Sequence, residues 1–239
     1  MKKIGQKLQQ LLTKEIGDFF LGHPVQDIND LGIIIQSDFK FTAHINSIFN
    51  KASKSLGFLK RNTKYFDNIF TLKLLYNTLV RSHLYYCLPL WYPTQVTFQA
   101  KIESIQKEFI KYICRKTNVE YHRINYSFLC SELDLIPFDI IYKKELIVSI
   151  YNVVHKHSNP NLLEFINFKE PNVRLRFVLP FCVPIFKSQT EQCIIMKAQV
   201  LLNQLSRDPI LNISTLFNLS VTLLRRYVLD SITSSFQCF

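Results

Sequence analysis

The stretch that decides the fold runs from residue 42 to residue 61 and reads TAHINSIFNKASKSLGFLKR. Its apolar side chains recur every three or four residues, which places them on one face of a helix. These side chains are Ile45, Ile48, Phe49, Ala52, Leu56 and Leu59. Lys51, Lys54 and Arg61 fall away from that face, and Thr42 is of a type that caps helix N-termini. The stretch predicts a long helix that is apolar on one side and basic on the other.

A second helix is predicted to follow, capped by Asp67 and extending to about Tyr86. Leu88 and Pro89 are expected to end it, because the residue before a proline disfavours the helical conformation. The inward-facing side chains of this helix are predicted to be Leu72, Leu75, Tyr76, Leu79 and His83.

A third helix begins after Pro93 and again separates apolar from basic residues. Its apolar stripe consists of Phe98, Ile102, Ile105, Phe109 and Ile113, and its basic stripe of Lys101, Lys107, Lys111 and Arg115. An apolar stripe packs on a core, and a basic stripe can face phosphates. Lysine is also common at any exposed helix position, so this helix alone leaves both interpretations open.

Between the second and third helices lies an unusual run, LVRSHLYYCLPLWYPT, at residues 79–94. It contains Arg81, several aromatic side chains and the single tryptophan of the chain, Trp91. We expect Arg81 to reach Tyr85 or a nearby acid, and the aromatic side chains to pack where the chain turns. The alternative is that these aromatic side chains stack on nucleic-acid bases.

The flanking regions complete a mainly α-helical prediction. Apolar residues at helical spacing between Ile4 and Ile16 predict a helix, and two extended runs, Phe19–Leu21 and Leu31–Ile35, predict a β-hairpin. A helix from Pro137 to about His155 is apolar nearly all round and should be central. Residues 173–186 should be extended, and helices should follow at about residues 189–205 and 219–232.

The composition points to an anionic partner. The 239 residues are 48% hydrophobic, which is enough for a core, and carry a formal charge of +11. Between Lys40 and Lys116 we count 13 Lys/Arg and 3 Asp/Glu, so nearly all of the excess lies there. Nucleic acid is the first candidate partner and an acidic membrane surface the second, while a merely solvated basic surface is the simplest reading.

Other features narrow the class of protein. No apolar run reaches 18 residues, so no membrane span is expected. The six cysteines form no C-x-x-C pair, which favours buried reduced thiols in a cytoplasmic or nuclear protein over zinc or a disulfide scaffold. The carboxylates are scattered singly, and no P-loop, H-E-x-x-H, G-x-S-x-G or dinucleotide motif is present. The residues therefore indicate no catalytic centre, no metal site, no cofactor and no small-molecule substrate.

Three segments together carry a resemblance to a known family. They are NDLGIIIQSDFKFTAHINSIFNKASKSLGFLKRN, TLKLLYNTLVRSHLYYCLPLWYPT and KIESIQKEFIKYICRK. In order and spacing, over about 90 residues, they closely resemble the region after the catalytic palm in reverse transcriptases of LINE-type, non-LTR retrotransposons of the jockey-like group. The matching motif positions are Asp30, Gly32, His44, Arg81, Tyr86, Trp91 and Pro93. The second half matches more weakly, with Ile141 and Tyr142 where the family usually has two arginines.

The resemblance implies a division of the chain and a function. Residues 1–38 would be a palm remnant with a helix and a β-hairpin, 39–120 a three-helix thumb, and 121–239 a helical post-thumb region. The thumb would bind RNA–DNA or RNA duplex through phosphates, with Lys51, Lys54, Arg61, Lys101, Lys107, Lys111 and Arg115 as the expected contacts. The catalytic carboxylates and their Mg²⁺ would belong to the missing palm, a further expected partner, so this truncated portion is expected to be inactive alone.

Two alternatives remain open at this stage. The first is a non-enzymatic helical scaffold whose basic face binds an acidic protein. The second is a complete RNA-directed DNA polymerase whose catalytic part lies on another chain or in upstream sequence.

Overall fold

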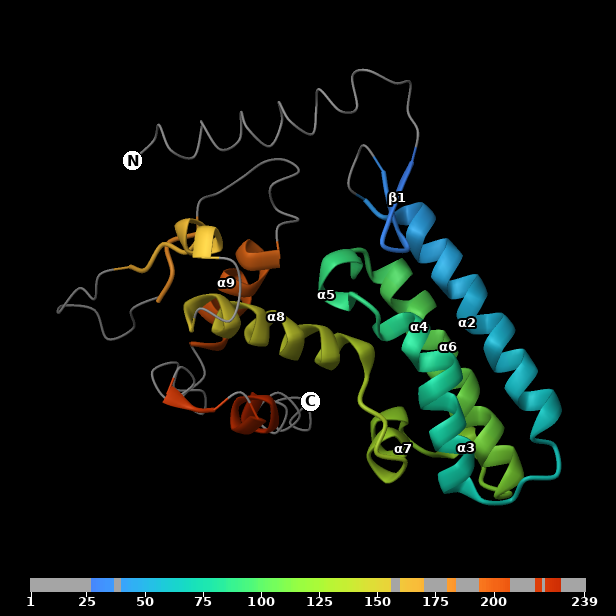
Figure 1. Ribbon diagram of the computed structural model, residues 1–239. Coiled ribbons are helices and arrows are strands. Elements are labelled where there is room, and N and C mark those ends of the chain that lie inside the picture. The colour runs from blue at the N-terminus through green and yellow to red at the C-terminus, as the bar shows by residue number, and fades with distance from the viewer. Residues whose placement is uncertain are drawn as a thin grey trace.

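Three helical rods pack side by side in the first half of the chain. The computed structural model describes residues 27–36, 40–155, 160–169, 180–183, 194–206, 218–220 and 222–228. Two of the rods, α2 (Thr42–Asn62) and α6 (Val96–Lys116), run in the same direction. The third rod, made of α3 (Ile69–Tyr76), η1 (Asn77–Arg81) and α4 (Ser82–Tyr85), runs back in the opposite direction beside them (Figure 1). The predicted mainly helical fold with a small N-terminal hairpin is confirmed.

The apolar stripes predicted for the first and third helices form the core of this bundle. In α2, Ile45, Ile48, Ala52, Leu56 and Leu59 are buried, and Phe49 is partly buried. In α6 the buried apolar side chains are Ile102, Ile105, Phe109, Ile110, Ile113 and Cys114. Burying these side chains removes apolar surface from water, which is the main force that holds the three rods together.

Both predicted helix caps, Thr42 and Asp67, are wrong, because other side chains accept the hydrogen bonds of the first amides of each helix. At the start of α2 the cap position is Phe41, in a left-handed conformation (φ 56°), and Thr42 is already helical. The side-chain oxygen of Gln36, in the segment before the helix, accepts a hydrogen bond from the Ala43 amide at 2.9 Å. At the start of α3 the cap is Asn68, not Asp67, and its side chain accepts from the Thr71 amide at 3.2 Å.

A π-helical turn in the returning rod changes which residues face the core. Leu72 and Tyr76 are buried as predicted, but the next buried positions are Val80 and Leu84, not Leu79 and His83. Residues at strict intervals of four drift by about 40° per step on a straight α-helix. The π turn at Asn77–Arg81 adds a residue to one turn and cancels this drift. It therefore turns Leu79, which is 41% exposed, and His83 toward solvent.

The third rod ends at Tyr85, slightly before the end that was predicted from Leu88 and Pro89. Tyr86 is extended and Cys87 is left-handed (φ 50°), which stops the helix after Tyr85. Pro89 then lies in the first turn of a new short helix, α5 (Leu88–Trp91), where a missing amide hydrogen costs nothing.

A two-stranded antiparallel hairpin precedes the bundle. Strand β1 (Ile28–Asp30) pairs with β2 (Ile33–Ile35), and Leu31 and Gly32 form the turn with φ values of 46° and 84°. Two positive φ values are typical of the tight turns that join such strands. The second predicted strand is thus present, but its partner is Ile28–Asp30. The helix predicted at Ile4–Ile16 and the strand predicted at Phe19–Leu21 lie outside the described residues.

The second half of the chain is built around one apolar helix, α8 (Phe138–Val154). Its start contributes Phe138 and Ile141 to the bundle core, and the rest of it packs into a second core with α9 (Ile194–Leu205). The other described elements here are η2 (Tyr121–Arg123), α7 (Tyr126–Glu132), η3 (Pro160–Phe165) and a helical stretch at 222–228. The predicted central role of this helix is confirmed. Of the extended segment predicted at 173–186, only 180–183 is described, and Phe181 there forms a bridge with Phe168.

The boundary predicted near residue 120 stays a prediction, but the first core reaches beyond it. Leu129, Cys130 and Leu135 belong to the same buried cluster as the three rods. Among the helices of the described segments, none combines the length and the apolar character that crossing a bilayer requires.

Replacing Trp91 by alanine should destabilise the bundle strongly. Trp91 is 1% exposed and among the largest fully buried side chains, and large-to-small core substitutions of aromatic residues cost about 3–5 kcal/mol. Urea denaturation would measure the free energy of unfolding. Tyr65→Ala, at a position that is 86% exposed, is the control and should change that energy by less than about 0.5 kcal/mol. Equal effects of the two substitutions would contradict the assignment of Trp91 to the core.

Candidate nucleic-acid interface

The motif residues meet at the hairpin end of the bundle. The Tyr86 hydroxyl donates to the carbonyl of Leu31 in the hairpin turn at 3.1 Å, and the Trp91 indole donates to the carbonyl of Tyr86 at 2.8 Å. The Ile34 amide donates to Nδ1 of His44 at 3.3 Å, and the His44 ring meets the Trp91 ring edge-on at 5.6 Å. These contacts fix the hairpin against the start of α2 and the corner around α5.

The other motif positions have similar structural settings. Gly32 provides the positive φ of the hairpin turn, Asp30 is exposed at the end of β1, and Pro93 is buried after α5. Nδ1 of His44 accepts the Ile34 amide hydrogen, so this nitrogen carries no proton, and burial and the nearby charge of Lys51, which lower the pKa of His44, favour that form. The hydrogen bonds of His44, Tyr86 and Trp91 are all made within the protein and do not require a bound ligand.

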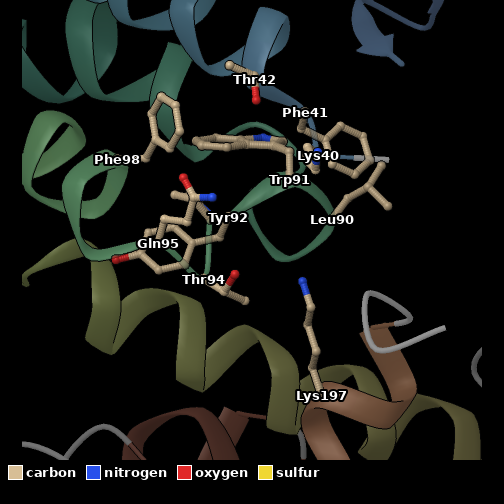
Figure 2. A pocket seen from close by; sticks show the side chains of 11 residues that line it. Lys40, Phe41, Thr42, Leu90, Trp91, Tyr92, Thr94, Gln95, Phe98 and Lys197 are labelled. Carbon is tan, nitrogen blue, oxygen red and sulfur yellow. The ribbon is translucent and has the colours of Figure 1, made fainter. Parts of the chain in front are cut away.

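The aromatic side chains of the corner are largely packed. Trp91 and Tyr92 are 1% and 4% exposed, so their ring faces are covered by protein, whereas Tyr86 is 51% exposed. Figure 2 shows Trp91, Tyr92 and Phe98 around a small pocket that Lys197 of α9 enters from the opposite wall. Packing, and not base stacking, therefore describes Trp91 and Tyr92.

Arg81 holds the bundle to the second half of the chain. Its guanidinium donates to the carbonyl of Ile136 and lies 5.4 Å from the ring centre of Phe138, at the start of α8. The prediction that it would reach Tyr85 or an acid is wrong, because the π turn directs it inward. The Tyr85 hydroxyl instead donates to Glu145 at 2.8 Å, and burial together with this carboxylate raises the pKa of Tyr85 to about 12.

A partly buried polar junction lies beside Arg81. One oxygen of the Glu103 carboxylate accepts from the Tyr126 hydroxyl, and the other accepts from the Phe138 amide at 3.1 Å. Gln106 donates to the Tyr126 oxygen at 3.2 Å. Burial raises the pKa of Glu103, although these hydrogen bonds and the charge of Arg81 act in the opposite direction. The junction joins α6, α7 and α8.

The three predicted contacts on α2 are available to a ligand. Lys51, Lys54 and Arg61 are exposed, and within the described residues none of them forms an ion pair. Lys54 lines a groove between α2 and the returning rod, together with Phe58, Leu79 and His83.

The four predicted contacts on α6 differ from one another. Lys107 and Arg115 are exposed, and the Lys107 ammonium lies 5.1 Å from the ring centre of Tyr126. Lys101 donates to the side chain of Asn46 on α2 at 2.6 Å, and Lys111 forms an ion pair with Glu108 at 2.9 Å. All four residues lie on α6 as predicted, but among the described residues Lys101 and Lys111 are engaged by polar or acidic side chains, whereas Lys107 and Arg115 form no ion pair.

The seven predicted contacts do not form one patch. Lys101 and Lys111 lie along the seam between α2 and α6, where Lys60 also reaches Glu108 at 3.3 Å. Lys54 lies on the groove that α2 forms with the returning rod. The wheel of a single helix could not show this division, because it depends on which neighbour each face meets.

Sequence reasoning missed a set of exposed apolar side chains near these cations. Around the turn from α2 to α3, Tyr65, Phe66 and Phe70 are 86%, 45% and 73% exposed, and we call these three residues the aromatic tip. Phe58, on the groove, is 55% exposed. Their only sequence signal is that they fall outside the apolar stripes of the helices.

Substituting glutamine at Glu103 and at Glu108 should give opposite pH dependences of stability. Burial raises the folded-state pKa of Glu103, so the parent protein loses stability as pH rises from the unfolded value of about 4.3 through the raised pKa. Glu103→Gln lacks this loss, and its stability relative to the parent should increase with pH. Hydrogen bonds from Lys111 and Lys60 lower the pKa of Glu108, so Glu108→Gln should instead lose relative stability as pH rises through the lowered pKa to about 4.3.

Urea denaturation of the three proteins between pH 3 and pH 7 would measure both trends. Two curves with the same sign would contradict the description of Glu103 as a desolvated carboxylate and Glu108 as a paired one.

The described residues include metal-ligating types of side chain and free thiols. Within the described ranges, no three His, Cys, Asp or Glu side chains gather where a metal ion could be held. Cys114 and Cys130 are buried free thiols as predicted, whereas Cys87 and Cys182 are exposed.

No family model, curated protein or solved structure matches this chain.

Proposed function

We propose that the helical bundle binds duplex nucleic acid through its phosphates, in the manner of a polymerase thumb. The chain would be the region that follows the palm in a non-LTR retrotransposon reverse transcriptase. Two observations support this function: the resemblance across the three motif segments, and the charge that the folded bundle leaves exposed.

The observation that carries the proposal is that every acid of the basic region is already engaged. Between Lys40 and Lys116 the three carboxylates are Asp67, Glu103 and Glu108. Glu103 accepts its hydrogen bonds in the polar junction beside Arg81, and Glu108 is shared by Lys60 and Lys111. Asp67 lies 4.0 Å from Lys116.

Much of the positive charge that is left over lies on the surface of α2 and α6. On these two helices the exposed cations without an ion pair in the described residues are Lys51, Lys54, Arg61, Lys107 and Arg115. Long flexible cations on rigid helices suit phosphates, which repeat along a duplex whatever its sequence. We therefore assign sequence-independent binding to the bundle. The polymerase chemistry and its Mg²⁺ would belong to the palm.

A second candidate is a scaffold that binds an acidic protein. The aromatic tip and Phe58 favour it, because apolar side chains rimmed by charge are typical of protein interfaces. A direct competition experiment would separate the two candidates. Displacement of a bound acidic protein by duplex nucleic acid would favour the first, and failure to displace it would favour the second.

Replacing both Lys107 and Arg115 by alanine should weaken duplex binding and flatten its salt dependence. Each phosphate contact contributes about 0.9 to the slope of log K against log salt concentration, so the slope should fall in magnitude by about 1.8 if both residues contact phosphates. Adding Lys111→Ala should change the slope less than either of these two, because Lys111 is paired with Glu108. Fluorescence anisotropy with a 20-base-pair RNA–DNA hybrid at several salt concentrations would measure the slope.

The matched control is Lys169→Ala combined with Arg226→Ala, which removes the same charge at exposed positions of the second half. It should leave the slope within about 0.5 of the parent value, because the counterions released belong to local contacts. Binding that does not depend on salt, or an equal loss in the control, would overturn the proposal.

A further inference from the structure

The groove beside α2 has a composition that duplex binding does not explain. It is lined by Lys54, Ser55 and Phe58 of α2 and by Thr78, Leu79, Ser82 and His83 of the returning rod. The π turn creates it, because a regular helix would have turned Leu79 and His83 into the core. A backbone irregularity that opens a groove lined by polar and apolar groups together is a common setting for a functional site.

The polar groups of the groove include no carboxylate. Lys54 supplies a positive charge, and His83 supplies an imidazole ring with hydrogen-bonding nitrogens. The hydroxyls of Thr78 and Ser82 donate to the helix backbone, to the carbonyls of Leu74 and Thr78 at 2.9 and 2.6 Å. Their oxygens can still accept hydrogen bonds from a ligand.

Phe58 stands between cations along one face of α2. It is 55% exposed, with Lys51 and Lys54 before it and Arg61 after it. At about 1.5 Å per residue, Lys54 and Arg61 lie about 6 and 4.5 Å from Phe58 along the axis, and the whole row spans about 15 Å. At the duplex rise of about 3.4 Å per nucleotide the row would span about four nucleotides, and a more extended single strand would place fewer along it.

We propose that this groove binds single-stranded nucleic acid. An unpaired base stacks on the exposed ring of Phe58 and contacts Leu79 across the groove, while Lys51, Lys54 and Arg61 hold the phosphates on either side. Aromatic rings flanked by cations are the general means of gripping single strands without reading their sequence. A duplex cannot use Phe58 in this way, because its bases already stack on one another.

An amphipathic protein helix fits the groove less well. Such a helix needs a continuous apolar floor, and here only Phe58 and Leu79 are large and apolar among seven lining residues. The inference takes its class of polyanion from the proposed function, and it gives the three cations of α2 a second, single-stranded ligand at the groove.

Replacing Phe58 by leucine tests the stacking. The substitution keeps an apolar side chain but removes the ring, so affinity for labelled single-stranded dT20 should fall by about 5- to 100-fold. Affinity for the 20-base-pair hybrid should stay within about twofold of the parent value. Phe70→Leu is the matched control: Phe70 is also exposed but lies outside the groove, and its replacement should leave both affinities unchanged. Circular-dichroism melting curves of both variants would confirm that they fold.

The outcomes distinguish this inference from the proposed function. No loss of dT20 affinity in Phe58→Leu, or equal loss in Phe70→Leu, overturns the groove site even if duplex binding is intact. Salt-independent or absent duplex binding, with dT20 affinity that still depends on Phe58, overturns the thumb-like function and leaves the groove site standing. Failure of dT20 to bind, together with Phe58-dependent binding of a Glu-rich amphipathic helical peptide, would show that the groove docks a protein and that the inference is wrong.

Discussion

The π turn at Asn77–Arg81 is the constraint on which the bundle depends. Leu72, Tyr76, Val80 and Leu84 are all fully buried, although they are four residues apart. On a straight α-helix, side chains at this spacing would gradually turn away from the core. The extra residue in one turn lets all four side chains pack between α2 and α6. Tyr76 stacks on Phe109 with ring centres 4.0 Å apart, and its buried hydroxyl has no hydrogen-bond partner in the described structure.

The same turn links the bundle to the rest of the chain. Because it directs Arg81 inward, the guanidinium can reach the carbonyl of Ile136 and the ring of Phe138 at the start of α8. Glu103 accepts from the amide of Phe138 from the other side. Helix α8 then carries Ile140, Leu146 and Ile150 into the second core. The position of that core relative to the bundle is therefore set by a few polar contacts at one helix start as well as by apolar packing.

The periodicity of apolar residues correctly predicted the core-facing side of the regular helices. The apolar stripes of α2 and α6 identified Ile45, Ile48, Leu56, Ile102 and Phe109 as core residues, because a regular helix places them on one face. The inward positions after Tyr76 could not be predicted, since nothing in Leu79 or Val80 signals a π turn. The cap of α2 was missed for a related reason: Gln36, which accepts from Ala43, belongs to the segment after β2. Five of the seven predicted cations are exposed, whereas Lys101 and Lys111 are partly buried, and the division of the cations between a seam and a groove required the positions of neighbouring helices.

The aromatic tip has a consequence for the behaviour of the protein in solution. Tyr65, Phe66 and Phe70 expose large apolar surfaces at the end of a strongly positive bundle. At low ionic strength, mutual repulsion keeps such ends of separate molecules apart. The Debye length shrinks from about 10 Å at 0.1 M salt to about 3 Å at 1 M, so concentrated salt removes that repulsion while leaving the apolar attraction in place. The washes that strip bound polyanions from the protein would thus also favour its self-association, and arginine or a mild detergent would be the additive of choice during purification.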